Sequence, residues 1–273
     1  MGDVLKRAGT AGVLVPIVLA AIYLDESPWA VGAACAIVGW ISLDEYLRMA
    51  LPVTETDRGT LLRVVTGLLG IGIVMLPLVW GPGLVLPPLL AGSAIAIGFA
   101  TLARPAALPD AGKHFGVCLS GLLYVPLLIA VLPLLKQQGL AHWITISLCM
   151  AFFSDTVAYF FGRAFGKHKL YEAVSPKKTW QGAFGGVLGS LAATVGIGSM
   201  WLTPELSIGH AVVLGVLGNI CGQAGDLVES MLKRTHGVKD SSNLLPGHGG
   251  MLDRIDAMVY VAPVVYYYVT RIA

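Results

Sequence analysis

Carboxylates, basic side chains and glycines gather in one polar stretch, residues 223–256, of a chain that is otherwise very apolar. Asp226 ends one long apolar run, and Asp253 and Asp256 stand at the start of the next. A basic loop with a Gly-rich turn at 247–250 separates them. Carboxylates suit a hard divalent cation, whereas ammonium groups and the N–H groups of such a turn suit phosphates. The stretch therefore predicts a site for a metal ion and a polyphosphate.

The alternative is a polar loop without chemistry, since a connection between two apolar helices has only to be hydrated. That alternative does not explain residues 246–250, Pro-Gly-His-Gly-Gly, followed by Asp-Arg-x-Asp. Glycines allow positive φ angles and a close approach of the backbone to a ligand. Asp253 and Asp256 are spaced i, i+3, so they share one face if the segment is helical. His248 is interpreted as a structural or phosphate-contacting group.

Two further groups of polar residues precede this stretch. Asp155 lies inside an apolar segment, where a carboxylate is costly and usually faces a partner or a wet cavity. Residues 175–180, Ser-Pro-Lys-Lys-Thr-Trp, place two ammonium groups and two hydroxyl groups beside a rigid turn. Lysines act as point charges for phosphates. The alternatives are an Asp155 that is only paired inside the protein, lysines that only fix membrane topology, and a Trp180 that is an interfacial residue instead of part of a base pocket.

At these residues the chain resembles the phosphatidate cytidylyltransferases, also called CDP-diacylglycerol synthases. About a dozen fixed positions of the family signature agree over the 27 residues 230–256. The surroundings of Asp155 and of residues 175–182 are similar to other blocks of the same family. Ser242 departs from the signature, which more often has Gly there. The resemblance covers roughly residues 150–263, and the earlier part of the chain matches only in its apolar character.

The resemblance implies that the protein transfers CMP from CTP to phosphatidate, which gives CDP-diacylglycerol and pyrophosphate. It implies Mg²⁺ as the cofactor, with a second, monovalent cation left open. The expected partners are CTP, phosphatidate and membrane lipids, without nucleic acid, and a homodimer is left open. The expected catalytic residues are Asp226, Asp253, Asp256 and Lys178, and the three aspartates are also the expected metal ligands. The expected substrate-binding residues are Asp155, Lys167, Ser175, Lys177, Lys178, Thr179, Lys233, Arg234, Lys239, Asp240, His248, Gly249, Gly250 and Arg254.

Proteins of other classes compete with this interpretation. A CTP-dependent lipid kinase of the polyprenol or dolichol type would move the γ-phosphoryl group to a lipid alcohol. A cation transporter would carry ions on carboxylates at the membrane midplane, but here the acidic residues gather at one border beside a basic loop. A CDP-alcohol phosphotransferase would need an acidic motif that the sequence lacks. The phosphate of phosphatidate is largely ionised at neutral pH, so its attack on CTP requires no strong general base.

The elements that must position these residues are membrane helices. The chain has 273 residues, of which 56% are hydrophobic and 12% charged, with a mean hydropathy of +0.76, whereas soluble domains carry about 25% charged residues. We therefore expect an all-α polytopic integral membrane protein. Residues 1–140 would form N-terminal helices, and residues 141–273 would form C-terminal helices with the catalytic loops. The nine expected spans are roughly 10–24, 28–43, 61–80, 83–103, 115–135, 142–162, 183–202, 207–225 and 255–272.

The distribution of basic residues predicts the orientation. With the N-terminus in the cytoplasm, 16 of the 18 Lys and Arg residues lie on the cytoplasmic side, as the positive-inside rule requires. The polar loops then face the cytoplasm, where nucleotides are, and the C-terminus lies outside. The expected location is the cytoplasmic (inner) membrane. The net charge of +2 follows from this topology and gives no sign of nucleic-acid binding.

The first half of the chain carries little readable chemistry. Residues 44–48, Asp-Glu-Tyr-Leu-Arg, end the second expected span and are interpreted as an interfacial cap with an aromatic anchor. Four cysteines lie in apolar runs and none forms a Cys-x-x-Cys pair, so neither a zinc site nor a disulfide framework is expected.

Overall fold

The computed structural model describes residues 12, 15–51, 56–103, 108–245, 247 and 249–272, so the predicted substrate-binding residue His248 lies outside the described residues. Seven of the described helices are long and apolar enough to cross a membrane, which confirms an all-α polytopic membrane protein. The expected count of nine spans is not reproduced among the described residues. The helix described at residues 15–23 and the 14-residue α12 (Met258–Arg271) are both shorter than the about 20 residues that a span needs. The seven are Trp29–Ala50, Thr60–Trp80, Pro82–Ala103, Asp110–Gln137, Ala141–Phe165, Trp180–Leu202 and Ile208–Thr235.

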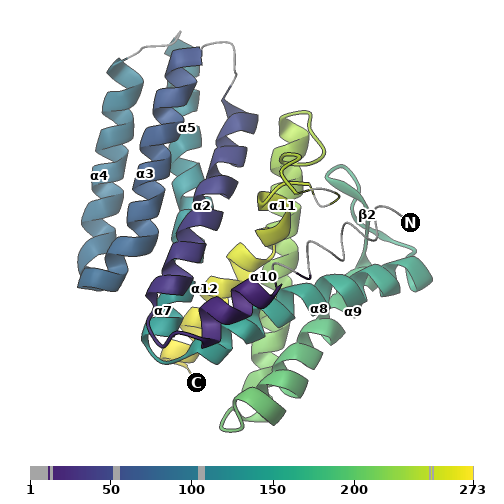
Figure 1. The fold of residues 1–273 in the computed structure, drawn as a ribbon. Coiled ribbons are helices and arrows are strands. Elements are labelled where there is room, and N and C mark those ends of the chain that lie inside the picture. The colour runs from purple at the N-terminus through teal and green to yellow at the C-terminus, as the bar shows by residue number, and fades with distance from the viewer. Residues whose placement is uncertain are drawn as a thin grey trace. The chain divides into compact units, whose positions relative to one another are not determined.

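The chain forms two compact units, residues 1–137 with 240–254, and residues 138–239 with 255–273. The loop 240–254 thus belongs to the first unit, although it follows the second in sequence. The helices of the first unit are α2 (Trp29–Ala50), α3 (Thr56–Trp80), α4 (Pro82–Ala103), α5 (Leu108–Tyr124), α6 (Pro126–Ile129), α7 (Val131–Gln137) and most of α11 (Leu252–Ile255) (Figure 1).

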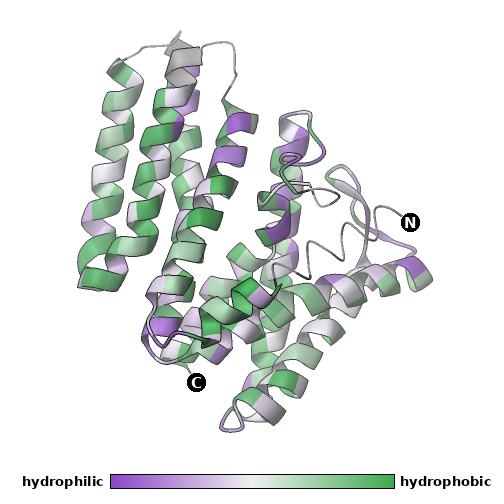
Figure 2. Cartoon of the chain, in the orientation of Figure 1, coloured by the Kyte–Doolittle hydropathy of each residue, from purple (hydrophilic) through white to green (hydrophobic). Residues whose placement is uncertain are grey.

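Hydropathy explains how the first unit packs. Hydrophobic residues cover most of α3 and α4, and hydrophilic residues gather at the C-terminal end of α2 (Figure 2). Completely buried side chains such as Leu43, Leu47 and Leu135 form the core of this unit. Pro126 lacks an N–H and lies at the first position of α6, where it separates that helix from α5.

The second unit holds the Gly-rich segment that the sequence shows after residue 180. Its elements are α8 (Ala141–Phe165), strands β1 (Lys169–Tyr171) and β2 (Ser175–Thr179), α9 (Trp180–Leu191), the π-helical η1 (Ala192–Leu202), α10 (Ile208–Thr235) and α12. A Cβ atom at Gly189 would collide with the backbone of Phe153 in α8, and one at Gly185 would collide with the ring of Phe161. These glycines therefore let α8 and α9 pack closely, as small residues do in membrane helices.

A short β-hairpin joins α8 to α9 and was not expected from the sequence. The strands pair antiparallel, with Lys169 opposite Thr179 and Tyr171 opposite Ser175. The hydroxyl of Thr179 accepts a hydrogen bond of 3.1 Å from the N–H of Gly182, so the end of β2 is also the N-cap of α9. This cap fixes the lysines of β2 relative to the first turn of α9.

Candidate functional site

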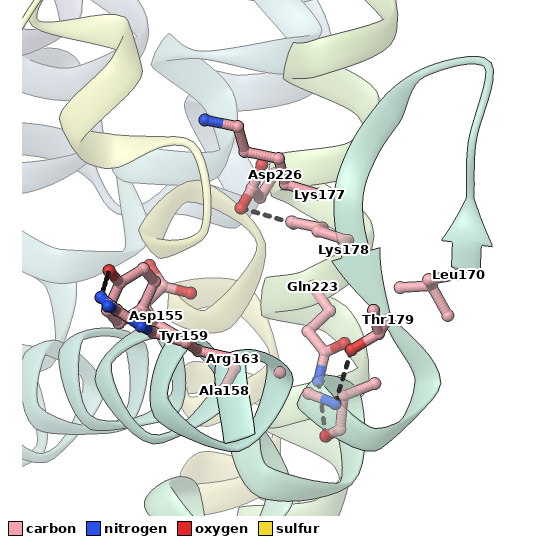
Figure 3. Close-up of a pocket in the computed structure, with 13 residues that line it drawn as sticks. Asp155, Ala158, Tyr159, Arg163, Leu170, Lys177, Lys178, Thr179, Gln223 and Asp226 are labelled. Carbon is pink, nitrogen blue, oxygen red and sulfur yellow. Dashed lines mark hydrogen bonds and ion pairs between the residues drawn. The ribbon is translucent and has the colours of Figure 1, made fainter. Parts of the chain in front are cut away.

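A polar pocket of about 600 Å³ lies in the second unit (Figure 3). Its walls come from α8, β1, β2, α9 and α10. Its charged and hydrogen-bonding side chains are Asp155, Tyr159, Arg163, Lys177, Lys178, Thr179, Gln223 and Asp226. Five of these are residues predicted for substrate or metal binding. Its size is that of a small-molecule site, for which cavities of about 300–1,000 Å³ are usual.

An ion pair connects the hairpin to α10. The ammonium of Lys178 lies 2.5 Å from the carboxylate of Asp226, and the two side chains are 26% and 23% exposed. Because both remain partly accessible, an incoming ligand can still reach them. The hydroxyl of Ser230 donates a longer bond of 3.4 Å to the other oxygen of Asp226. Figure 3 shows Lys177 and Lys178 beside Asp226.

Asp256 precedes α12 and belongs to the same unit as the pocket. Burial, and next the negative charge of Asp226, raise the pKa of Asp256 to about 8. Asp155 raises this pKa further, whereas Lys178 and the backbone N–H of Ala257 oppose the rise. The carboxyl of Asp256 therefore favours its protonated form beside Asp226, and a cation bound there would favour the ionised form.

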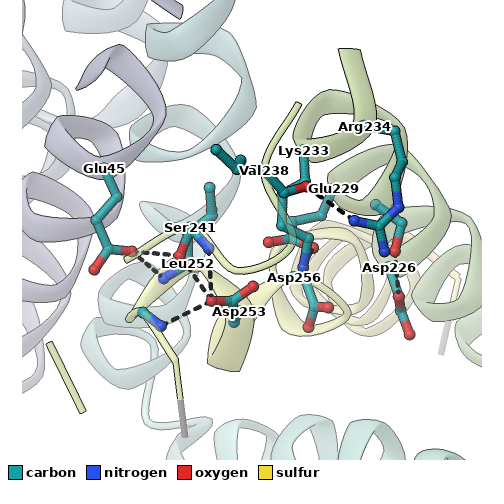
Figure 4. Close-up of polar contacts among 12 residues, drawn as sticks. Glu45, Asp226, Glu229, Lys233, Arg234, Val238, Ser241, Leu252, Asp253 and Asp256 are labelled. Carbon is teal, nitrogen blue, oxygen red and sulfur yellow. Dashed lines mark hydrogen bonds and ion pairs between the residues drawn. The ribbon is translucent and has the colours of Figure 1, made fainter. Parts of the chain in front are cut away.

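The C-terminal turns of α10 contain a second, more buried ion pair (Figure 4). Lys233 pairs with Glu229 one turn earlier, and the Glu229 carboxylate is completely buried. Arg234 donates a hydrogen bond of 2.9 Å to the carbonyl of Val238, which closes the turn after the helix. Lys239 is exposed. Of the basic residues predicted here, Lys233 and Arg234 thus have structural partners within their own segment.

In the first unit, Glu45 of α2 binds the loop 240–254 (Figure 4). Its carboxylate is 4% exposed and accepts four hydrogen bonds. Two come from hydroxyl groups, those of Ser241 at 2.9 Å and Ser242 at 2.6 Å. Two come from backbone N–H groups, those of Met251 at 3.0 Å and Leu252 at 2.8 Å. A buried carboxylate is costly unless it is hydrogen-bonded, and this loop supplies the bonds.

Asp253 organises the same loop from within. One of its oxygens accepts bonds from the N–H of Ser241 at 2.9 Å and the N–H of Gly250 at 2.7 Å. The same oxygen lies 2.9 Å from the hydroxyl of Ser241, whose one hydrogen it shares with Glu45. A Cβ at Gly250 would collide with the Ser241 hydroxyl and the Glu45 carboxylate. Gly249 has a φ of +77°, which a residue with a side chain adopts only at a cost. The two glycines are therefore required by the loop's own conformation.

The predicted residues fall into separate groups. The polar pocket brings together Asp155, Lys177, Lys178, Thr179 and Asp226, with Asp256 electrostatically coupled to Asp226. Lys167 and Ser175 are not among its lining residues. The predicted residues Asp240, Gly249, Gly250, Asp253 and Arg254 belong to the loop of the first unit.

Sequence reasoning missed Glu45 and the pocket residues Tyr159, Arg163 and Gln223. The interpretation of residues 44–48 as an interfacial cap is wrong for Glu45 and Tyr46. Both are buried, Glu45 is hydrogen-bonded to the loop, and the Tyr46 hydroxyl lies 2.9 Å from that of Ser120. A carboxylate near the end of an apolar helix was the available signal, since such a group requires a partner.

The carboxylates of the site are the candidate ligands for a divalent cation. Among the described residues, no three His, Cys, Asp or Glu side chains form a ready metal-binding group. Mg²⁺ usually takes only one or two carboxylates and completes its shell with phosphate oxygens and water. Asp226, whose charge raises the pKa of Asp256, and Asp256 itself fit that requirement together with a polyphosphate.

Comparison with known proteins agrees with this chemistry. The sequence profile of the cytidylyltransferase family matches residues 5–272. The phosphatidate cytidylyltransferases of Staphylococcus saprophyticus and Staphylococcus aureus are each 35% identical to this chain, over 231 and 233 residues, which cover 83% of this chain and 85% of theirs. A chloroplastic phosphatidate cytidylyltransferase of Arabidopsis thaliana is 43% identical over 137 residues, 48% of this chain and 34% of that protein.

Proposed function

Because this chain belongs to the cytidylyltransferase family, we propose that its polar pocket is where CMP passes from CTP to phosphatidate. The products are CDP-diacylglycerol and pyrophosphate. A phosphate oxygen of phosphatidate attacks the α-phosphorus of CTP, and the bond from that phosphorus to the β-phosphate bridging oxygen breaks. The nucleophile is already ionised, which agrees with a pocket that offers cations and carboxylates instead of a strong base.

The observation that carries this assignment is the ion pair between Lys178 and Asp226 inside a pocket that also contains Lys177 and Arg163. The two substrates together bring several negative charges, which repel each other. Lys177, Lys178 and Arg163 supply positive charge from two different elements, β2 and α8. Preorganised charges of this kind stabilise a transition state because they need no reorganisation during the reaction.

Asp226 and Asp256 are the residues that would hold Mg²⁺. When bound there with nucleotide, the cation would neutralise charge that develops on the phosphates. Within the protein, Asp226 also holds the Lys178 ammonium, so this carboxylate would position one phosphate-binding cation of the chain itself. Asp253, in the loop of the first unit, remains a predicted ligand.

The orientation is part of the proposal. With the N-terminus in the cytoplasm, the lysines of the hairpin lie on the side where CTP is made available, and the phosphatidate headgroup reaches them from the adjoining leaflet. The bacterial relatives support placement in the cytoplasmic membrane. Cysteines introduced at the exposed positions Lys177 and Gln138 should react with impermeant reagents from opposite sides, and reaction of both from one side would contradict the topology.

CTP labelled separately on the α- and γ-phosphates tests the reaction. Purified protein is incubated in mixed micelles with phosphatidate and Mg²⁺, and lipid and aqueous products are separated. The α-label should enter the lipid and the γ-label should leave as pyrophosphate. Entry of the γ-label into a lipid alcohol would instead show a CTP-dependent lipid kinase, and omission of phosphatidate should abolish incorporation of the α-label.

A further inference from the structure

An apolar groove of about 500 Å³ lies next to the polar pocket in the second unit. One wall is a face of α9, with Trp180, Phe184 and Val187 at helical spacing. The other is a face of α10, with Val216, Ile220 and Leu227. Along α10 the groove extends over the twelve residues from Val216 to Leu227, which corresponds to roughly 16 Å of helix.

The groove and the pocket share a boundary. Leu170, Ala183 and Gln223 line both of them. The amide of Gln223 donates to the carbonyl of Ala183 at 3.0 Å and to the side chain of Asn219 at 2.9 Å. Gln223 is therefore held as a wall between a charged compartment and an apolar one. A molecule with a charged head and an apolar tail fits across this boundary.

The direction of the groove follows from the numbering. Asp226, beside Leu227, lines the pocket, and Lys178 pairs with it two residues before Trp180. Val187 and Val216 therefore lie at the end of the groove away from the charged groups. An amphiphile with its phosphate near Lys178 would extend its chain along α9 and α10 toward these two valines.

We propose that this groove holds one acyl chain of phosphatidate while its headgroup occupies the polar pocket. The inference rests on the proposed function, because it takes a phosphate monoester lipid as the substrate. The transfer of the chain from the bilayer to the groove contributes little free energy, because it exchanges one apolar environment for another. The contribution of the groove is to position the headgroup. Holding the chain limits the movement of the headgroup, and correct placement of a reacting group accounts for a large share of rate enhancement.

Val187→Trp fills the far end of the groove, and Leu188→Trp is its matched control. Leu188 is the next residue of α9, is 52% exposed and does not line the groove. For Val187→Trp, kcat/KM with dioleoyl phosphatidate should fall about tenfold or more, because the displaced chain shifts the headgroup. With dihexanoyl phosphatidate, whose chains are too short to reach position 187, kcat/KM should be unchanged. The KM for CTP should not change in either variant.

The opposite wall provides a second pair if the first variant does not fold. Val216→Trp fills the groove from α10, and Leu217→Trp places the same ring on an outward face that is 42% exposed in the wild type. Equal losses for both members of a pair, or equal losses for long and short chains, would overturn the proposal. If the wild type transfers no CMP to any phosphatidate, the proposed function itself fails, which is a different result.

Photocrosslinking identifies the occupant directly. Phosphatidate with a diazirine at the end of one acyl chain is compared with phosphatidylcholine that carries the same chain, both in the wild-type protein. Peptides containing residues 183–191 and 212–220 should be labelled more strongly by phosphatidate, and excess dioleoyl phosphatidate should compete. Equal labelling by the two lipids would show that only bulk membrane lipid occupies the groove, and the proposal would be wrong.

Discussion

Replacement of Glu45 by Gln changes one atom of a buried hydrogen-bond network. One carboxylate oxygen accepts from the N–H of Met251 at 3.0 Å, and the other accepts from the N–H of Leu252 at 2.8 Å. Glutamine has the same size, but one of its terminal groups is an NH₂ that can only donate. Whichever oxygen is replaced, a backbone donor then faces another donor. The neighbouring serine hydroxyls can rotate, whereas these backbone groups cannot.

The magnitude follows from the burial of the site. A buried N–H that loses its acceptor costs about 1–3 kcal/mol, and Glu45 is only 4% exposed, so water does not replace the acceptor. Because about 1.4 kcal/mol corresponds to a tenfold change in an equilibrium constant, the ordered loop should become about 5- to 150-fold less favoured over its open forms. Asp253 bonds within this loop, so its position should become less defined.

Amide hydrogen exchange at Met251 and Leu252 measures this opening without reference to activity. Glu45→Gln should accelerate exchange there by the same factor and lower kcat/KM, while the melting temperature of the helical part changes little. Asp44→Asn is the control, since Asp44 pairs with the exposed Arg48 and the partly exposed Arg63, and solvent-accessible pairs contribute about 0–1 kcal/mol. Unchanged exchange in Glu45→Gln, or equal acceleration in both variants, would refute the assignment of Glu45 as the residue that holds the loop.

Three other substitutions test the remaining contacts. Asp226→Asn should keep the fold and lower kcat about 100-fold or more, whereas the exposed Glu172→Gln should not; wild-type turnover in Asp226→Asn would exclude Asp226 from the catalytic centre. Gly250→Ala should reduce activity strongly because its Cβ collides with the loop, while Ala at the open position Gly92 should not; full activity of Gly250→Ala would show that the loop tolerates displacement. Thr179→Val should destabilise the start of α9 by about 1 kcal/mol through loss of the N-cap, measured by thermal unfolding, and an unchanged melting temperature would contradict the cap.

The sequence was sufficient for the class of fold because composition decides it. A chain with so few charged residues cannot form an ordinary soluble surface, and long apolar runs can satisfy their backbone in a membrane only as helices. The sequence predicted the ends of the spans less accurately. Pro126 divides one predicted span into shorter helices, and α12 begins at Met258, after Asp256, because local packing and proline decide where a helix starts.

The polar pocket was partly predictable because its residues occur in compact sequence clusters. Lys177 and Lys178 stand out beside Pro176, and Asp226 stands out at the end of an apolar run. The ion pair between Lys178 and Asp226 depends on a hairpin of eight strand residues. No periodic pattern in the sequence predicts how these strands pair. The pairing of Lys233 with Glu229 was visible as an i, i+4 spacing, but its burial was not, because burial depends on how the helix packs.

Glu45 marks the limit of local reasoning most clearly. The cost of a carboxylate in an apolar helix predicts that some partner exists, yet the donors lie 196 to 207 positions further along the chain. Nothing in the spacing of residues 44–48 distinguishes a carboxylate that faces solvent from one that faces such a loop. In the loop, the two serines and Gly250 indicate a tight turn, but not that its backbone N–H groups bind an anion. The acceptor lies in α2 and the donors lie in the loop, and only their contact in the fold shows that α2 holds this loop.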